Sequence, residues 1–209
     1  SMFKKGFGTD IDMDKAINYF MRSAELNNTN AKRTLALEYL SGEYLEPDIE
    51  KGLEMLTECA DRGDIMSCFK LGKIYFKGEI VYKDLNMAEK YFLKASKKEN
   101  QYAYYSLGKL YLEKEKYSIN KAVEYFDKAL RYEEIKPYAE YSLAKIMLDN
   151  NPYHDSEKAV SLLESAAMEN DWASFLLGRL YLYGRDDIPK DKEKAMEWLE
   201  LSAEQGNEY

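Results

Sequence analysis

Apolar side chains recur along the whole chain at the three- and four-residue spacing of an amphipathic helix. No segment shows the sustained alternation of apolar and polar residues that is typical of a half-buried strand. The first kind of segment carries Ala or Ser, then Leu-Gly or Leu-Ala, then usually Tyr. The second kind carries a bulky pair and then a small pair, as in Tyr91-Phe92 and Ala95-Ser96. The pattern therefore predicts an all-α chain built from two alternating kinds of helix.

These two kinds of helix repeat about every 36 residues. The first kind is marked by Ala31, Ser67, Ala103, Ala139 and Ala173, and the second by Ala16, Gly52, Ala88, Ala122, Ala159 and Ala195. Self-similarity at such a period is typical of stacked helical hairpins. We expect units at about 1–28, 29–64, 65–100, 101–136, 137–170 and 171–209, forming one array over residues 1–209.

Each second helix has a candidate N-cap four residues before its small residue. These caps are Asp12, Asp48, Asp84, Ser118, Asp155 and Asp191. A side-chain oxygen there accepts a hydrogen bond from an unpaired N–H of the first turn and stabilises the helix by about 1 kcal/mol. Gly42, Gly78 and Gly184 are expected to form the turn after the first helix. The repeated tyrosines of the first helix are predicted core residues, namely Tyr39, Tyr75, Tyr111 and Tyr181.

The last unit carries the fullest set of repeated positions: Ala173, Leu177-Gly178, Tyr181, Gly184, Asp191, Lys194-Ala195, Trp198-Leu199, Ala203 and Gln205-Gly206-Asn207. This pattern resembles the Sel1-like repeat, a relative of the tetratricopeptide repeat, and the resemblance covers essentially the whole chain. The fourth unit departs most, with Ala144 and Met147 at the Gly and Tyr positions. The resemblance implies an α-α superhelix, a right-handed solenoid of about five helical hairpins, that binds partner proteins. Residues 3–8 resemble the end of a first helix, so we expect a fragment of a longer protein.

Composition narrows the classes of function. The chain has 30 basic and 38 acidic residues and a net charge of −8, which argues against binding to nucleic acid or to anionic membranes. No apolar run approaches the roughly 20 residues of a membrane span. Two cysteines, Cys59 and Cys68, favour buried thiols in a reducing compartment over a disulfide staple. We therefore expect a cytoplasmic protein, with the reservation that a native signal sequence could have been trimmed away.

Candidate chemistry is sparse. His154 is the single histidine and lies in a polar loop, without metal partners or a nucleophile at a recognisable spacing. No glycine-rich phosphate loop is present. We therefore expect no catalytic residue, no metal and no cofactor, and we predict a scaffold or adaptor rather than an enzyme. The alternative is a regulatory or substrate-recruiting region of a larger enzyme whose catalytic domain lies outside this sequence.

One face of the first helices remains for a partner. First helices line the concave side of tetratricopeptide-like arrays, and the positions opposite the core stripe should face that groove. Three positions of each first helix are counted from the Gly or Ala that follows its Leu. The position one residue after it holds Leu37, Lys73, Lys109, Lys145 and Arg179, and the position three residues before it holds Arg33, Phe69, Tyr105, Tyr141 and Phe175. The position six residues before it holds Asn30, Met66, Tyr102, Tyr138 and Trp172. On a helix these positions share about a third of the circumference.

This face predicts a basic and aromatic groove, in which a partner protein or peptide with acidic and apolar side chains would bind. A structural alternative remains open. The lysines would then pair with nearby carboxylates, and the aromatic rings would pack between neighbouring first helices.

Overall fold

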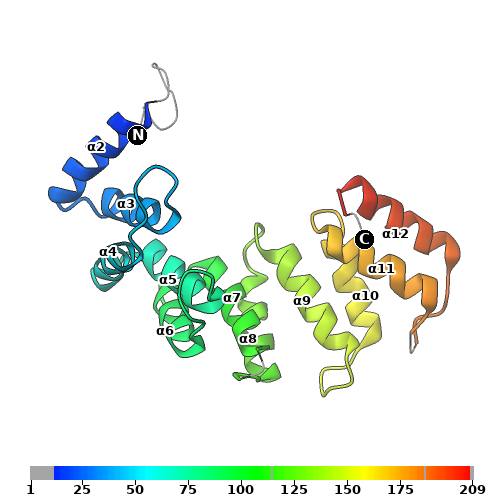
Figure 1. The fold of residues 1–209 in the computed structure, drawn as a ribbon. Helices are drawn as coiled ribbons and strands as arrows, with labels where there is room; N and C mark the ends of the chain where they lie inside the picture. The colour runs from blue at the N-terminus through cyan, green and yellow to red at the C-terminus, as the bar shows by residue number, and fades with distance from the viewer. Residues whose placement is uncertain (1–11, 114, 186, 208–209) are drawn as a thin grey trace. The chain divides into compact units, whose positions relative to one another are not determined.

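A computed structural model of the protein describes residues 12–113, 115–185 and 187–207. They form α2 (Met13–Glu25), α3 (Thr29–Ser41), α4 (Ile49–Asp61), α5 (Ile65–Lys77), α6 (Leu85–Ser96), α7 (Gln101–Tyr111), α8 (Ile119–Ala129), α9 (Lys136–Leu148), α10 (Ser156–Ala166), α11 (Asp171–Tyr183) and α12 (Lys192–Glu204), which Figure 1 labels. Within these ranges the only β pairing is an isolated bridge between Arg185 and Ile188. The predicted all-α class, an α-α superhelix, is confirmed.

The helices pair in the order that the repeat predicts. We call α3, α5, α7, α9 and α11 the A helices, and α2, α4, α6, α8, α10 and α12 the B helices. Each A helix packs on the B helix that follows it, as α3 does on α4 and α11 on α12. In the hairpin of α7 and α8, the rings of Tyr111 and Tyr125 stack at 5.7 Å. The first helix expected before α2 falls among residues 1–11, outside the described residues.

Two kinds of hydrogen bond recur at the beginnings of the described B helices, one to the side chain of the cap residue and one from its backbone N–H. Five of the six predicted caps accept a backbone hydrogen bond through the side chain: Asp12, Asp48, Asp84, Asp155 and Asp191. Ser118 occupies the cap position of α8 but makes no such side-chain bond, so that detail of the prediction is wrong. Its backbone N–H still donates to the carbonyl of Tyr111 at 2.8 Å, the link that every A–B hairpin makes at this position. The backbone link therefore fixes the turn even where the side-chain cap is missing.

The predicted turn glycines are confirmed. Gly42 and Gly78 follow α3 and α5 with φ of 66° and 72°, in the left-handed region where a side chain is strained. The repeated tyrosines divide into two groups. Tyr111 and Tyr181 are buried, and Tyr75 is half-buried but packs against the core cluster of its unit. Tyr39 is half-buried and belongs to no such cluster among the described residues, which corrects its assignment to the core.

The half-buried position of Tyr39 and Tyr75 has a physical cause at the edge of each hairpin. The Tyr39 hydroxyl accepts a hydrogen bond from Lys51 Nζ at 2.8 Å, so its polar end stays near water. The Tyr75 ring stacks on Tyr91 at 6.0 Å, and Tyr91 takes the buried place. A tyrosine hydroxyl needs a partner when it is buried, which favours the partly exposed arrangement.

Glycine on an A helix lets a large B-helix ring approach closely. A Cβ at Gly72 would lie 2.5 Å from the Phe92 ring, and a Cβ at Gly108 would lie 2.5 Å from the Phe126 ring. Two other A helices carry Ala36 and Ala144 at this position. Their B helices supply a leucine where the others supply phenylalanine, namely Leu56 and Leu163, each in the same core cluster as its alanine. In these four hairpins a larger A-helix residue is matched by a smaller B-helix residue, whereas in the hairpin of α11 and α12 Gly178 faces Leu199.

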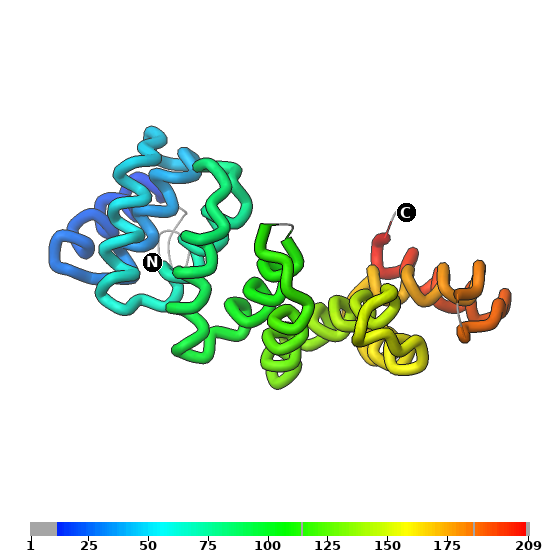
Figure 2. The backbone as a smooth tube through the Cα atoms, turned by 90° about the horizontal axis from the view of Figure 1, so that it is seen from below, coloured from blue at the N-terminus to red at the C-terminus, as the bar shows by residue number. Residues whose placement is uncertain are grey.

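The chain divides into two compact units, residues 1–103 and 104–209, and each is described by itself. In the first unit the buried core includes Leu56, Leu71 and Tyr91. In the second unit it includes Leu163 and Leu177. Figure 2 follows the backbone through the successive helices of each unit.

Candidate partner-binding surface

Four cations predicted for the groove are exposed, and each lies over an aromatic ring one turn earlier on the same helix. The distances to the ring centroid are 5.9 Å for Lys73 over Phe69, 5.8 Å for Lys109 over Tyr105, 5.4 Å for Lys145 over Tyr141 and 5.8 Å for Arg179 over Phe175. Residues four apart share a helix face, so the repeat brings each pair together. A cation–π contact at an exposed site is worth about 0.5–1 kcal/mol and leaves the charge in place.

None of these four cations forms an ion pair with a described residue. Among the B-helix lysines, Lys94 lies 3.0 Å from Asp61 and Lys128 lies 2.6 Å from Glu124. Lys121 and Lys194 instead lie over the rings of Tyr111 and Tyr181, as the A-helix cations lie over theirs. The carboxylate-paired alternative for the lysines is therefore not what the structure forms.

The structural alternative also predicted that the aromatic rings pack between neighbouring A helices, and some of them do. The Phe69 ring lies 5.8 Å from Tyr102, and the Tyr105 ring lies 6.3 Å from Tyr138, so these rings bridge successive A helices. Of these four rings, Tyr138 is 45% exposed and the other three are half-buried. Burial raises the pKa of the Tyr105 hydroxyl above its ordinary value, in keeping with a ring that packs inside the stack. The rings thus stabilise the stack and still leave area for a partner.

Two adjoining clefts open between the A helices of the second unit. A cleft of about 470 Å³ lies between α7 and α9, and one of about 260 Å³ lies between α9 and α11. Both clefts are lined by Tyr141, Lys145 and Asp149. Tyr105 and Lys109 complete one side of the larger cleft, while the smaller is lined also by Leu148, Trp172, Phe175, Leu176, Arg179 and Arg185. We call the exposed residues of α7, α9 and α11 that line these clefts the A-helix surface.

Charge on the A-helix surface is mostly positive. Asp149 is the one carboxylate among the described residues that line the two clefts, and it lies 3.7 Å from the guanidinium of Arg185. Lys109, Lys145 and Arg179 remain without a carboxylate partner there. A chain of net charge −8 therefore presents a locally basic, aromatic surface.

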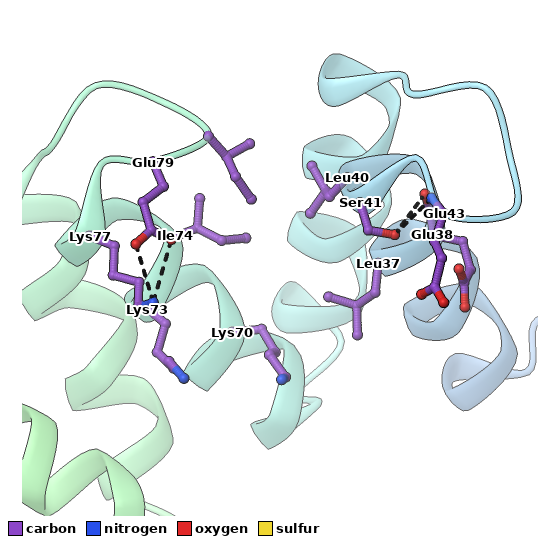
Figure 3. A pocket seen from close by; sticks show the side chains of 11 residues that line it. Leu37, Glu38, Leu40, Ser41, Glu43, Lys70, Lys73, Ile74, Lys77 and Glu79 are labelled. Carbon is purple, nitrogen blue, oxygen red and sulfur yellow. Dashed lines mark hydrogen bonds and ion pairs between the residues drawn. The ribbon is translucent and has the colours of Figure 1, made fainter. Parts of the chain in front are cut away.

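A separate cleft of about 390 Å³ lies in the first unit, between α3 and α5 (Figure 3). Leu37 and Leu40 of α3 lie across it from Lys73 and Ile74 of α5. Its lining also includes Lys70 and Lys77, which the sequence analysis did not select, and Lys77 Nζ lies 3.3 Å from Glu79. These lysines stand three before and four after Lys73, so helical spacing could have identified them.

Arg33 serves the fold rather than the groove, which corrects its predicted place. Its guanidinium donates to both oxygens of Asp64 at 2.7 and 2.8 Å and to Asn30. Asp64 caps α5 by accepting from the backbone N–H of Ser67 at 2.8 Å. Burial raises the pKa of Asp64, but the hydrogen bonds from Ser67 and Arg33 outweigh burial and hold that pKa below its ordinary value. Arg33 therefore ties α3 to the beginning of α5.

We expect Asp64→Asn to lower the free energy of unfolding by about 1–3 kcal/mol at neutral pH, because it weakens a charge-assisted contact and a helix cap. The folded pKa of Asp64 is depressed, so its contribution is fully present above the unfolded value of about 3.9 and is lost as pH falls through the folded pKa. Denaturant titrations at pH 7 and in acid should show the wild type losing its advantage over the variant as pH falls. A constant difference across that range would contradict the assignment.

The described residues offer little for catalysis or metal binding. No group of three or more metal-ligating side chains gathers in residues 12–113, 115–185 and 187–207. His154 is exposed, and Cys59 and Cys68 are buried free thiols. Nor does any helix in the described ranges have the length and apolar character needed to cross a membrane.

The fold and its repeated surface define a helical-repeat protein. A family model described as the Sel1 repeat matches six times, at residues 1–28, 31–64, 65–100, 101–131, 137–171 and 173–207. The chain therefore belongs to the Sel1 repeat family. Sel1 repeats generally mediate protein–protein interaction, and scaffolds built from them are typically non-catalytic.

Solved structures agree with this fold. A protective antigen of uropathogenic Escherichia coli with an SLR fold is 21% identical, with a TM-score of 0.81; the match covers 99% of this chain and 44% of that one. A Sel1 repeat protein from Oxalobacter formigenes is 26% identical, with a TM-score of 0.80 and coverage of 98% and 84%. An immunity protein from Pseudomonas aeruginosa is 18% identical, with a TM-score of 0.57 and coverage of 94% and 75%. No curated protein matches this chain in sequence.

Proposed function

We propose that this chain is a protein-interaction scaffold whose A-helix surface binds a partner polypeptide with acidic and apolar side chains. The observation that supports this most directly is the alternation of unneutralised cations with clefts, Lys109, then Lys145, then Arg179. What distinguishes these three cations from lysines that lie over rings elsewhere, such as Lys121 and Lys194, is that they line clefts. The net charge of −8 opposes nucleic acid as the partner. The two free thiols suit a scaffold in the reducing cytoplasm.

Typical interaction free energies indicate how much of the binding affinity charge and apolar contact would each supply. Micromolar affinity needs about 8 kcal/mol. Exposed ion pairs contribute about 0.2–1 kcal/mol each, so the three cations together supply about 0.6–3 kcal/mol. Burial of apolar area, at about 25 cal/mol per Å², must supply the larger part through the rings of the clefts and the half-buried Leu176. The cations then set orientation, selectivity and association rate.

The combined variant Lys109→Glu, Lys145→Glu and Arg179→Glu should weaken partner binding at least about tenfold, because attraction becomes repulsion at three positions of the A-helix surface. A partner captured from extract with the wild-type protein supplies the ligand, and its affinity for both proteins is measured by calorimetry. The matched control is Lys98→Glu, Lys158→Glu and Lys192→Glu, which makes the same charge change at exposed positions outside the A helices. Circular dichroism checks the fold of each. Undiminished binding by the first variant would refute the proposed surface.

A further inference from the structure

The backbone after α12 forms the same turn that leads from a B helix into an A helix at three earlier places. Gly206 has a φ of 95°, in the left-handed region. Its N–H donates to the Ala203 carbonyl at 3.0 Å, and the N–H of Asn207 donates to the Ser202 carbonyl at 3.1 Å. The turns before α3, α5 and α7 contain the same pair of backbone bonds and the same left-handed residue, which is Asn27, Gly63 or Glu99. At each of those places an A helix follows directly.

Asn207 occupies the cap position of this turn. In the earlier turns the same position is held by residues that cap α3, α5 and α7 through a side-chain oxygen, namely Asn28, Asp64 and Asn100. Asn207 Nδ2 also donates to the carbonyl of Asp171, at the beginning of α11, at 3.4 Å. Asn170, the cap of α11, makes the corresponding bond to the Pro137 carbonyl of α9 at 3.2 Å. Asn207 is therefore held as a residue that begins an A helix is held.

One side of α12 is less covered than the same side of the other B helices. The side that packs on α11 (Figure 1) is buried, but Met196, Leu199 and Ala203 lie one and two turns apart on a neighbouring side, which we call the α12 face. Met196 is 61% exposed, Ala203 is exposed and Leu199 is half-buried. The residues equivalent to Leu199 in α4, α6, α8 and α10 are each 0% exposed: Leu56, Phe92, Phe126 and Leu163. Four of the five residues equivalent to Ala203 are buried: Ala24, Ala60, Ser96 and Ala167.

Inside the array, the A helix that follows a B helix covers this side. α3 packs on α2, α5 on α4, and α11 on α10. On α2 the counterparts of the α12 face are Ile17, Phe20 and Ala24. Ile17 and Ala24 form one buried cluster with Ala31 and Leu35 of α3, and Phe20 packs against that cluster. The occupant that fits the α12 face is therefore a helix with a small residue three positions after its cap and a leucine seven positions after it.

We propose that the α12 face binds a further A-type helix of the same polypeptide, which begins at Asn207. The formed turn and the uncovered face are separate observations, and both favour this occupant. An isolated helix shorter than about 12–15 residues is only marginally stable in water. A helix that continues from the turn also avoids the loss of translational and rotational freedom that a separate molecule would undergo. The proposal does not depend on the proposed function, because it concerns α12 and not the A-helix surface.

The natural gene tests whether the polypeptide supplies this helix. The reading frame should place a small residue three positions after Asn207, leucine seven positions after it, and glycine or alanine eight positions after it. The same spacing follows the caps of α3, α5, α7 and α11. A reading frame that stops before these positions, or that continues without this pattern, would overturn the proposal.

A thiol placed on the α12 face tests whether such a helix docks there. Ala203→Cys is made in the full chain and in the same chain extended after Tyr209 by a copy of residues 173–184, which continue the A-type pattern in register. The extension should slow reaction of the introduced thiol with a maleimide by about tenfold or more, because the helix covers it. Glu197→Cys, an exposed position on another side of α12, should react equally in both chains. Cys59 and Cys68 are buried, and their slow reaction is subtracted with chains that lack the introduced thiol.

A second extension with the same residues in shuffled order separates docking from mere length. Protection of the Ala203→Cys thiol by the ordered extension alone would support the proposal, with circular dichroism checking the fold of each chain. Equal reactivity in the unextended and both extended chains would overturn it. The occupant would instead be a second copy, and the proposal would again be overturned, if the thiol of the unextended chain became protected as protein concentration rose.

Discussion

Phe92→Ala should lower the free energy of unfolding of the first unit by about 3–5 kcal/mol, the range for removing a buried aromatic side chain. Phe92 is fully buried, and its ring lies 6.0 Å from Phe69 and 6.2 Å from Phe76. The glycine at position 72 has no side chain to move into the cavity, so relaxation should recover little of the loss. Denaturant unfolding followed by circular dichroism measures the change.

Tyr82→Ala is the matched control for Phe92→Ala, because Tyr82 is an aromatic residue of the same unit that is 98% exposed. It should change stability by no more than about 0.5 kcal/mol. In stacked repeats each hairpin contacts only its neighbours, so unfolding of the second unit should be affected less. A loss below about 1 kcal/mol for Phe92→Ala would show that this ring is not the centre of its hairpin.

The same substitution connects the core with the candidate surface. The Phe69 ring lies 6.0 Å from the Phe92 ring, and the Lys73 ammonium lies 5.9 Å from the centroid of the Phe69 ring. Removal of the buried ring therefore removes support for an exposed cation–aromatic pair. The residues that hold the hairpins together and those that face a partner are thus in direct contact.

Much of the fold follows from the sequence because its determinants are local and repeated. Helical spacing, aspartate caps and left-handed glycines act within a few residues, and six copies of the pattern reinforce one another. The exceptions lie where a side chain has a choice of partners. Ser118 sits at a cap position without making the side-chain bond, and Tyr39 turns its hydroxyl to Lys51 instead of entering the core.

The candidate surface was less accessible to sequence reasoning. Each cation lies over a ring because the two residues are four positions apart on one helix, a spacing that can be read from the sequence. Arg33 and Asp64 are 31 positions apart, and their ion pair depends on how two repeats pack. No local sequence pattern therefore predicts it. Cleft shape likewise depends on loops, since Asn150 and Asn151 line the larger cleft from the irregular fourth unit.

The exchange of volume between A and B helices yields a second large effect. Gly108→Ala should lower the free energy of unfolding by about 1–3 kcal/mol, because its Cβ would lie 2.5 Å from the fully buried Phe126 ring. Phe126→Leu alone should cost about 1 kcal/mol. Together the two changes recreate the alanine-with-leucine combination of Ala144 and Leu163, so the double variant should be more stable than the sum predicts by about 1 kcal/mol.

A double-mutant cycle on the full chain measures this coupling from four denaturant titrations. Gly108→Ala combined with Leu56→Ala supplies the control, because Leu56 lies in the other unit and the two positions share no partner. Additive effects there, together with a favourable coupling of Gly108→Ala and Phe126→Leu, would establish that the hairpin of α7 and α8 balances side-chain volume between its two helices. If the stability effects of Gly108→Ala and Phe126→Leu were simply additive, Leu163 would not be what compensates for Ala144 in the fourth unit. The departure of that unit from the repeat would then need another physical cause.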